Sequence, residues 1–586
     1  MKSTIILLLT ISIVQSSFAQ ENADIKWWNP AESEFPVVSG QAWPHEVQST
    51  FHRLPARAQE QVRTAVWDLS RQSAGLSVRF WTNASRIQIQ YQVTGKVAFP
   101  HMPATGVSGV DLYSKSYDGE WMRCWGSYEI DKESSYSFVI DNTDESYSKY
   151  GREYQLFLPL YNEVEALLIG VDPSSVFEAL PIRQEKPIVT YGTSICQGAC
   201  ASRPGMAWTN ILERKLERPL VNLGFSGNGR LEPELIDLLA EIDAKLYILD
   251  CLPNLRPGEH DTYQLTLNAV KKLREKRPEV PIILTAHVGY ADHLTNKKSG
   301  DKYLELNKEL SRAFNHLKSE GYTKIFHLRK EDLGLNFDSY VDTIHPNDLG
   351  MLQYANAYEN LIREVLNEPV GNIATTIPKT QSRDIAVYQW ENRHQKVLEL
   401  NKVNPPKTCL FGNSIVNFWG GAPKISVVNG KDSWEGTMEP LEIRNFGFGW
   451  DRIENVLWRI YHDELDGFAA DQIILMIGTN NLHLNTETEI IRGLEELMKA
   501  IRTRQPTCKI LMIGVLPRTG REQQVVSLNL KISQLADTEQ IDYADIGPSL
   551  LLKDGRVDES LFSDGLHPNS KGYQIMAREL QKLLRD

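Results

Sequence analysis

The sequence predicts an α/β protein in which an N-terminal antiparallel β-sandwich precedes two copies of one domain built on a parallel sheet. Residues 24–185 carry short segments of alternating apolar and polar residues, the pattern of half-buried strands. After residue 186, apolar strands alternate with helix-like stretches, which indicates a parallel sheet covered by helices on both faces. Four blocks of the first α/β region then recur in the second, in the same order.

The sandwich is indicated by strand-like segments that turn signals such as Thr94-Gly95 and Asp118-Gly119 separate. Alternation places every second side chain on one face of a sheet. Short strands at this spacing are typical of an antiparallel sandwich. The segments are residues 77–82, 86–93, 109–115, 137–142, 152–160 and 165–172.

The two α/β domains are expected over residues 186–367 and 405–586. Between them, residues 368–404 are interpreted as a linker and a connecting helix. The first part of this stretch, residues 368–383, is polar, contains two prolines and has no apolar period, which is the composition of a linker.

The internal repeat is the strongest signal in the sequence. Its four pairs of blocks keep one order and an almost constant separation, so chance is a poor explanation. The pairs are YGTSI (191–195) with FGNSI (411–415), NLGFSGNGR (222–230) with NFGFGWDR (445–452), YILDCLPN (247–254) with ILMIGTNN (474–481), and DTIHPNDLGM (342–351) with DGLHPNSKGY (564–573).

Composition and charge exclude several classes of protein. The 586 residues are 41% hydrophobic and 24% charged, a globular mixture that excludes a disordered or collagen-like chain and a membrane bundle. The net charge of −12 gives no electrostatic basis for binding nucleic acid or an anionic membrane surface. We therefore expect neither as a partner.

Residues 1–19 have the features of a secretory signal peptide. Lys2 supplies the positive start, an apolar run follows, and Ser17-Phe18-Ala19 is a small-x-small cleavage site. A membrane anchor is the alternative, but the apolar run is shorter than the roughly 20 residues that span a bilayer. The expectation is a periplasmic or secreted protein.

Six cysteines are too few for a disulfide scaffold in a chain of this length. Cys196 and Cys200 are four residues apart and would share one face of a helix, either as a disulfide or as two packed thiols. No Cys/His cluster has the spacing of a zinc site, so we expect no metal and no cofactor.

Each α/β copy carries residues suited to nucleophilic catalysis. Ser194 and Ser414 follow an apolar strand, at the strand end where open α/β sheets form their ligand crevice. Each copy closes with Asp-x-x-His, which is Asp342 with His345 in the first copy. In the second copy it is Asp564 with His567. A histidine can take the serine proton while an aspartate orients the imidazole and stabilises its charged form.

Acyl transfer also needs donors for the developing oxyanion. The backbone N–H of the serine is one candidate in each copy. The loop Ser226-Gly227-Asn228 offers a second backbone amide in the first copy. The side chain of Asn254, or of Asn480 in the second copy, offers a third.

This order of blocks resembles the SGNH, or GDSL-like, serine hydrolase superfamily. The second copy, with FGNSI, NFGFGWDRIENVLWRI and IGTNN, resembles the catalytic subunits of platelet-activating-factor acetylhydrolases. The chain as a whole resembles bacterial carbohydrate O-acetylesterases of the sialate type. The resemblance implies a flavodoxin-like three-layer fold and assigns roles by matching blocks. In copy one they are Ser194 as nucleophile, Gly227 and Asn254 in the oxyanion hole, and Asp342 and His345; in copy two they are Ser414, Trp450, Asn480, Asp564 and His567.

The sequence departs from the family pattern in two places. The family's Asp before the nucleophile is Thr193 here and Asn413 in the second copy. The oxyanion Gly of the second block aligns with Trp450, or with Gly449 if the alignment slips by one residue.

Two arginines follow strands at the predicted catalytic face. Arg203 and Arg518 could bind a substrate carboxylate, although both could equally be ordinary surface residues. His287 and His483 also lie near strand ends, and we interpret them as ordinary polar or packed side chains.

The expected function is an exported serine esterase that removes O-acetyl groups from carbohydrates, with an acetylated glycan of the sialic acid or host type as substrate. Acetylated plant polysaccharide (xylan or pectin), a lipid or thioester, and a non-catalytic role in carbohydrate binding stay open as alternatives. The sandwich would either bind glycan or support the first copy. The sequence leaves the oligomeric state open, as well as whether the two copies differ in specificity.

Overall fold

The computed structural model describes residues 25–141, 145–539 and 541–585. These residues form two compact units, one of the residues up to Lys115 and of those from Trp121 to Leu366, and the other of Ser116–Glu120 and the residues from Asn367 onward. Each unit is described by itself. The expected signal peptide, residues 1–19, lies outside the described residues.

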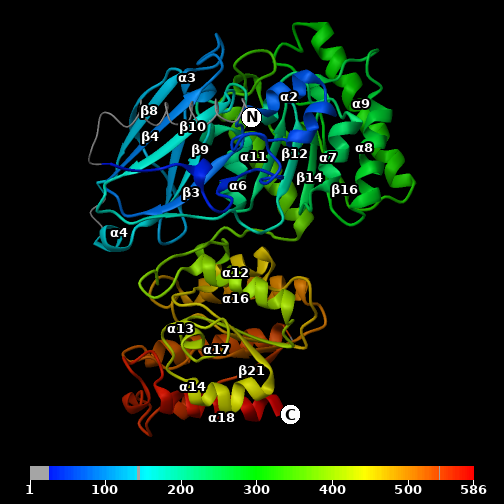
Figure 1. The fold of residues 1–586 in the computed structure, drawn as a ribbon. Coiled ribbons are helices and arrows are strands. Elements are labelled where there is room, and N and C mark those ends of the chain that lie inside the picture. Colours follow the sequence, from blue (N-terminus) through cyan, green and yellow to red (C-terminus); the bar gives the residue numbers. More distant parts are fainter. Residues whose placement is uncertain (1–24, 142–144, 540, 586) are drawn as a thin grey trace. The chain divides into compact units, whose positions relative to one another are not determined.

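The first unit begins with the predicted antiparallel sandwich (Figure 1). Alternation produces it directly, since every second residue of β4 is buried and the residues between them are more exposed. Side chains from the two sheets then share one core. One sheet has the order β1 (Lys26–Trp28), β10 (Val164–Val171), β4 (Arg86–Val93), β8 (Glu133–Val139) and β7 (Gly126–Glu129); the other has β11 (Phe177–Ala179), β3 (Ser77–Thr82), β9 (Arg152–Phe157), β5 (Asp111–Lys115) and β6 (Trp121–Arg123), with β2 (Val38–Ser39) paired to β3.

Residues 40–75 depart from the expectation that the whole region 24–185 is a sandwich. They include helix α2 (Thr64–Ser70), and Trp43, Leu54 and Trp67 are buried in a core that belongs to the first α/β domain. This segment lacks the alternation of the strands, and its apolar residues pack on the neighbouring sheet.

The first α/β domain contains five parallel strands in the order 2-1-3-4-5, the flavodoxin-like order. The strands are β13 (Leu220–Gly224), β12 (Ile188–Gly192), β14 (Leu246–Asp250), β15 (Ile282–Thr285) and β16 (Ile325–Leu328). Ile188 contributes to the core on one face of the sheet and Val189 to the core on the other, so both faces are covered, as predicted. One face carries α6 (Trp208–Leu216) and α11 (Asp348–Leu366), and the other carries α7 (Pro233–Glu241), α8 (Thr262–Lys276) and α9 (Lys297–Ser319).

The second unit repeats this architecture. Its strands have the order β18 (Ile443–Gly447), β17 (Thr408–Gly412), β19 (Gln472–Met476), β20 (Lys509–Ile513) and β21 (Asp542–Ala544), again 2-1-3-4-5. One face packs on α12 (Trp390–Val403), α15 (Ile453–Arg459), α16 (Glu487–Arg504) and α17 (Glu522–Glu539), and the other packs on α18 (Ser570–Arg585). The predicted fold class, a sandwich followed by two three-layer α/β domains, is thus confirmed.

The predicted linker packs against the second domain along much of its length. The Thr375 hydroxyl donates to the backbone oxygen of Glu489, and the Gln381 amide donates to that of Gly449. Thr375 and Gln381 are both buried. The sequence signal for a linker was low hydrophobicity, but polar side chains can fill a groove when each finds a hydrogen-bond partner.

Among the helices of the described ranges, none is both long enough and apolar enough to span a bilayer.

Arg53 joins the N-terminal segment to the first α/β sheet. Its guanidinium is buried and donates to four backbone oxygens, those of Leu69 and Gln72 at 2.6 and 2.7 Å and those of Asn222 and Gly224 at 3.1 and 2.8 Å. Burial lowers the pKa of Arg53 to about 10, which still leaves the side chain charged at neutral pH. The charge is stabilised by carbonyl dipoles, without a carboxylate among these hydrogen-bond partners.

We expect Arg53→Met to destabilise the first unit by at least about 3 kcal/mol, because four buried carbonyl groups lose their donor. The matched control is Arg57→Met, four residues away, which removes exposed ion pairs with Glu46 and Glu241 and should cost no more than about 1 kcal/mol. Denaturant unfolding of the full chain measures both. Equal losses in the two variants would contradict a special role for Arg53.

Candidate active sites

Ser194 lies where strand β12 ends and a short helix begins. The helix, α5 (Ser194–Gln197), is preceded by Thr193, whose hydroxyl accepts a hydrogen bond from the N–H of Ile195. This cap fixes the turn and leaves the N–H of Ser194 without an acceptor among the described residues. The predicted nucleophile therefore presents both its hydroxyl and a backbone donor at the carboxyl end of the sheet.

Asp342 and His345 meet Ser194 in space although they lie about 150 residues away in sequence. His345 Nε2 is 2.8 Å from Ser194 Oγ, and His345 Nδ1 is 2.7 Å from Asp342 Oδ2. Asp342 Oδ1 also accepts the backbone N–H groups of Ile344 and His345, both at 2.8 Å. The three side chains thus form a continuous Ser–His–Asp relay.

The hydrogen bonds determine the ionisation of Asp342. Burial alone would raise the pKa of this carboxyl, but the hydrogen bonds from the His345 ring and from the two backbone amides outweigh burial and lower the pKa. Asp342 is therefore a carboxylate at neutral pH. A carboxylate in this place stabilises the imidazolium that forms when His345 takes the serine proton.

Gly227 and Asn254 offer further donors in the first copy. Gly227 has a φ of +70°, and its N–H has no acceptor among the described residues. Asn254 Oδ1 accepts the N–H of Gly229 at 3.1 Å, which orients the side-chain amide and leaves its NH₂ group unused. Gly229 lies directly against the backbone of Gly192, since a Cβ at position 229 would be 2.0 Å from the Gly192 oxygen. The loop of Gly227 and Gly229 therefore lies beside Gly192 and Thr193, the two residues before Ser194.

The second copy repeats the relay. Ser414 begins α13 (Ser414–Asn417), and its Oγ is 2.8 Å from His567 Nε2. His567 Nδ1 is 2.7 Å from Asp564 Oδ2, and Asp564 Oδ1 accepts the backbone N–H groups of Leu566 and His567. As in the first copy, burial raises and hydrogen bonds lower the pKa of the aspartate, and the net shift is downward.

The donors of the second copy include Trp450. Its φ is +61°, close to that of Gly227, which supports the alignment of these two positions and argues against a slip to Gly449. The Trp450 N–H has no acceptor within the described chain, and its side chain is 46% exposed, so the ring is available to a ligand. Asn480 is buried, and its Nδ2 donates to the Asp451 oxygen at 3.0 Å, which leaves its second N–H for an oxyanion.

Arg203 has contacts within the fold that the sequence did not predict. Its guanidinium forms an ion pair with buried Asp111 and donates to the Tyr113 hydroxyl at 2.7 Å. Both partners belong to β5 of the sandwich. Arg203 therefore joins the sandwich to the first α/β domain through its Nη1, and a role in binding a substrate carboxylate stays a prediction.

Arg518 remains available in the second unit. Its contact is a long hydrogen bond of 3.4 Å to the Thr479 oxygen, next to Asn480, and no carboxylate in the described residues pairs with it. Burial and then the charges of four arginines lower the pKa of His483, which is exposed. The four are Arg383, Arg452, Arg518 and Arg521, of which Arg383 and Arg452 form ion pairs with Asp118. His287 differs, because it is fully buried and burial lowers its pKa to about 3, as expected of a packed histidine.

Several residues at the two sites had no sequence signal. His101, from a loop of the sandwich, has its ring centroid 6.1 Å from that of His345. The Phe418 ring lies 5.3 Å from that of His567 in the second copy. Asp384, from the predicted linker, lies against Gly449, where a Cβ would be 2.0 Å from Asp384 Oδ2. Such contacts join segments distant in sequence, which periodicity cannot reveal.

Cys196 and Cys200 do not share a helix face. Helix α5 ends at Gln197, and Cys200 lies beyond it with a φ of +67°. Both cysteines are free thiols, and the Cys196 thiol donates to the Thr190 hydroxyl in the core. The structure therefore has two free thiols and no disulfide between Cys196 and Cys200, and the two side chains lie in different surroundings.

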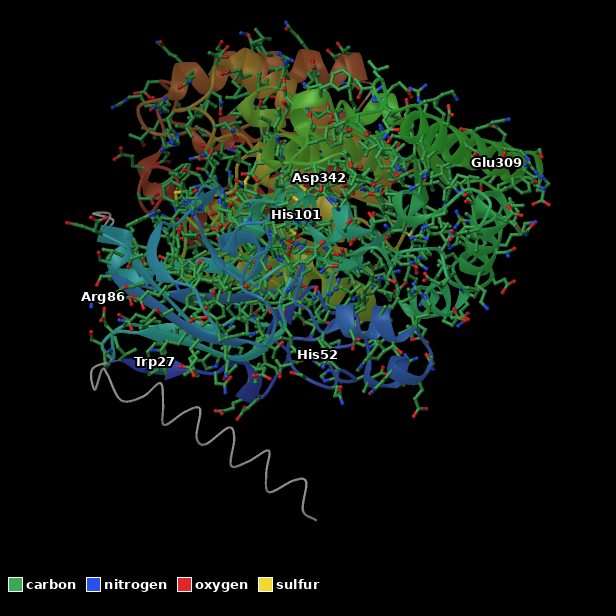
Figure 2. The ribbon with its side chains drawn as sticks, turned by 90° about the horizontal axis from the view of Figure 1, so that it is seen from above. Trp27, His52, Arg86, His101, Glu309 and Asp342 are labelled. Atoms are coloured by element: carbon green, nitrogen blue, oxygen red, sulfur yellow. The ribbon has the colours of Figure 1, made fainter. Side chains whose placement is uncertain are left out.

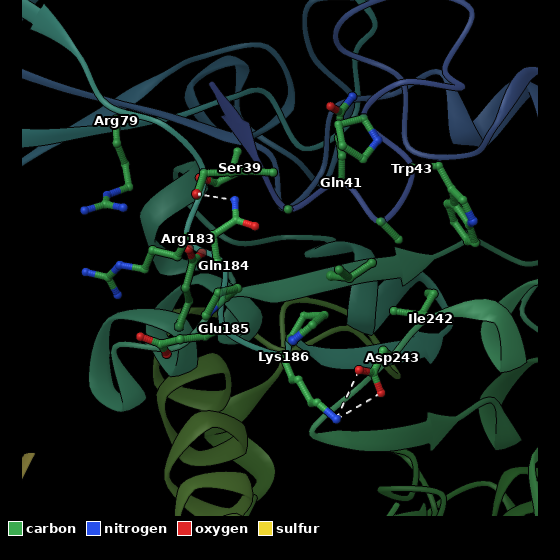
Figure 3. Close-up of a pocket in the computed structure, with 18 of the residues that line it drawn as sticks. Ser39, Gln41, Trp43, Arg79, Arg183, Gln184, Glu185, Lys186, Ile242 and Asp243 are labelled. Atoms are coloured by element: carbon green, nitrogen blue, oxygen red, sulfur yellow. Dashed lines mark hydrogen bonds and ion pairs between the residues drawn. The ribbon is translucent and has the colours of Figure 1, made fainter. Parts of the chain in front are cut away.

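A separate cavity of about 480 Å³ lies between the sandwich and the first α/β domain (Figure 3). It is lined by polar residues such as Arg79, Arg183 and Lys186 and contains no member of either relay. The cavity is therefore separate from both relays.

Comparison with known proteins divides the chain into three matching regions. Residues 185–363 and 410–575 each match a model described as the GDSL-like Lipase/Acylhydrolase family. Residues 25–177 match the GxDLY model, described as the N-terminus of an SGNH-hydrolase type of esterase. Residues 109–113 read GVDLY, so the motif includes Asp111 and Tyr113, the two partners of Arg203.

Individual relatives support the same regions. The chain is similar to a protein described as a GDSL-like lipase from Bacteroides ovatus, with 31% identity, a TM-score of 0.54, and coverage of 59% of this chain and 98% of that one. It is 29% identical over 201 residues to the alpha2 subunit of platelet-activating factor acetylhydrolase IB from Rattus norvegicus, which covers 33% of this chain and 83% of that protein. The alpha1 subunit from Homo sapiens is 25% identical over the same length and matches the same shares of the two chains.

We expect a serine-directed fluorophosphonate to label the full chain with about two phosphonyl groups, because both hydroxyls have a histidine within hydrogen-bond reach. Intact-mass measurement should find one label fewer in Ser194→Ala and in Ser414→Ala, and none in the double variant. Labelling that persists in the double variant would show that the nucleophiles lie elsewhere.

Proposed function

Because the chain belongs to the GDSL-like lipase/acylhydrolase family, we propose that it is an exported serine esterase that removes O-acetyl groups from carbohydrates. The observation that carries the proposal is the presence of two complete Ser–His–Asp relays, each with further donors nearby. If the two domains only bound carbohydrate, nothing would require the serine, histidine and aspartate to be within hydrogen-bond distance of one another in both copies.

The proposed reaction has two steps in each site. The histidine Nε2 takes the proton from the serine Oγ as Oγ attacks the ester carbonyl, and the Asp carboxylate stabilises the resulting imidazolium. The tetrahedral oxyanion accepts hydrogen bonds from the serine N–H, from the Gly227 or Trp450 N–H, and from the Asn254 or Asn480 amide.

The imidazolium then protonates the departing sugar oxygen, which leaves an acetyl-serine. In the second step His345 or His567 takes a proton from water, and the hydroxide attacks the acyl carbonyl. Collapse of this second intermediate returns that proton from the imidazolium to the serine oxygen and releases acetic acid, which loses its own proton to solvent and becomes acetate.

Export and a glycan substrate rest on separate observations. The leader-like residues 1–19 support export, and the acidic chain has no feature suited to an anionic membrane surface. Arg518, which has no carboxylate partner among the described residues, favours an anionic sugar such as sialic acid over neutral xylan, because a guanidinium can bind a carboxylate bidentately. Pectin, which is also anionic, stays an alternative.

A lipid-like acetyl ester is a second candidate for the second site. It is favoured by similarity to a protein named platelet-activating factor acetylhydrolase and by the exposed Trp450 ring beside the relay. Both candidates share the acetyl group and differ in the leaving alcohol. The proposed specificity of the two copies can therefore differ while the chemistry is the same.

We expect acetate release from O-acetylated sialoglycans, with xylan and pectin acetate and an acetylated phospholipid compared in the same assay. Ser194→Ala and Ser414→Ala should each remove one activity, and the double variant should release none, because each relay loses its nucleophile. Acetate release that survives in the double variant would overturn the assignment.

Arg518→Met should raise KM for O-acetylated sialate about 10-fold or more, because the substrate carboxylate loses a charged hydrogen-bond partner. Assayed in the Ser194→Ala background, turnover of the neutral ester p-nitrophenyl acetate should be nearly unchanged. Arg556→Met, which removes an exposed arginine paired with Asp554, is the matched control. An equal effect on both esters would indicate damage to the site and would count against carboxylate recognition.

A further inference from the structure

Four side chains that metals commonly bind gather at the first site. His101, Cys200, Asp342 and His345 each offer one ligand atom, and these atoms lie within 4.8 Å of one another. Figure 2 shows the labelled pair His101 and Asp342 close together. The sequence predicted no metal only because its Cys and His residues lack the short spacing of zinc sites. The four residues of this cluster come instead from a sandwich loop, the segment after α5 and the loop before α11.

We propose that the first site binds a zinc ion through His101 and Cys200 together with Asp342 or His345, and that this binding reversibly switches off the first relay. The regulation rests on the proposed esterase function, whereas the metal site does not. Imidazole nitrogen, thiolate sulfur and carboxylate oxygen are the three ligand types of protein zinc sites. The thiolate also disfavours Mg²⁺ and Ca²⁺, which prefer oxygen ligands.

The geometry makes inhibition a necessary consequence of binding. His101 and Cys200 supply only two ligands, so a third must come from Asp342 or His345. The two ring nitrogens of His345 hold Ser194 and Asp342, and a metal on either nitrogen breaks one of those hydrogen bonds. A metal on the Asp342 carboxylate competes with the imidazole for the same group. The Cys200 thiol binds as thiolate and releases its proton to solvent.

Cys200 has a backbone conformation that a side chain rarely adopts. Its φ of +67° lies in the left-handed region, and the equivalent residue of the second copy is Gly420, with a φ of +146°. Cys200 therefore has a backbone conformation that glycine would adopt more easily, and the cysteine is buried. Residues held in such conformations cluster at functional sites.

The second copy provides an internal comparison. The ring next to the His567 imidazole there is that of Phe418, whereas His345 of the first copy has the His101 ring beside it. The described part of the second unit contains no comparable group of ligand atoms. Zinc should therefore discriminate between the two sites of one polypeptide.

Direct binding is tested on the full chain after removal of metals and reduction of thiols. Co²⁺ should give a thiolate-to-cobalt charge-transfer band, and calorimetry with Zn²⁺ should find a site that outcompetes Mg²⁺ and Ca²⁺. Cys200→Gly, the residue that the second copy carries, should abolish the band and weaken zinc binding at least about 10-fold, as should His101→Gln for affinity. His483→Gln, an exposed histidine of the second unit, is the control. Unchanged zinc affinity in Cys200→Gly would overturn the metal site.

Regulation is tested with the single-site variants. Zinc should inhibit Ser414→Ala, in which only the first site works, and a chelator should restore the activity; Ser194→Ala should be insensitive. Adding Cys200→Gly to Ser414→Ala should remove the inhibition, measured relative to that variant's own metal-free rate. Equal inhibition of both sites, or none, would overturn the switch. If no variant hydrolyses any ester, the proposed function fails, while the cobalt band and the zinc titration still decide the metal site.

Discussion

Each Ser–His–Asp relay depends on the aspartate carboxylate, which holds both the backbone turn of the Asp-x-x-His segment and the histidine ring. One oxygen of Asp342 accepts two backbone N–H groups, and the other accepts the His345 ring. The carboxylate thus fixes the backbone and the imidazole together and stays ionised because three donors point at it. Asp564 does the same for His567. Since this arrangement forms within four residues, the fold has to bring only the serine to the imidazole.

The parallel sheet satisfies that requirement. Strands β12 and β17 are second in the spatial order of their sheets, and each ends in a tight turn into the helix that carries the serine. The relay distances agree between the copies to within 0.1 Å. The surroundings do not agree. Imidazole and thiol lie beside the first relay, whereas a phenyl ring, an exposed indole and Arg518, which has no carboxylate partner among the described residues, belong to the second site. Duplication has preserved the chemistry and allowed the walls to differ.

The features of this molecule that could be predicted from sequence are those marked by repeated blocks or by alternation of apolar and polar residues. Alternation predicted the sandwich, and the four repeated blocks predicted two sheets of identical strand order. Those blocks also contain the relay residues that the structure brings together. The ion pair of Arg203 had no signal in the sequence, because its partner, Asp111, is 92 residues away and shares no pattern with it. Likewise, residues 368–383 have the composition of a linker, although Gln381 and Thr375 are buried by specific polar contacts.

The sandwich is better understood as part of the first site than as a separable module. Trp43 and Trp67, from the segment between its strands, complete a core of the α/β domain, and Arg53 joins the same segment to Asn222 and Gly224 of β13. Arg203 meets β5 on another side, and His101 reaches the relay itself. Because the core and the site contain residues from both regions, cutting the chain at residue 185 would expose apolar surface and leave polar groups unpaired. The boundary at residue 185 therefore separates two kinds of sheet but does not separate two independently packed domains. The sandwich forms one side of the first relay.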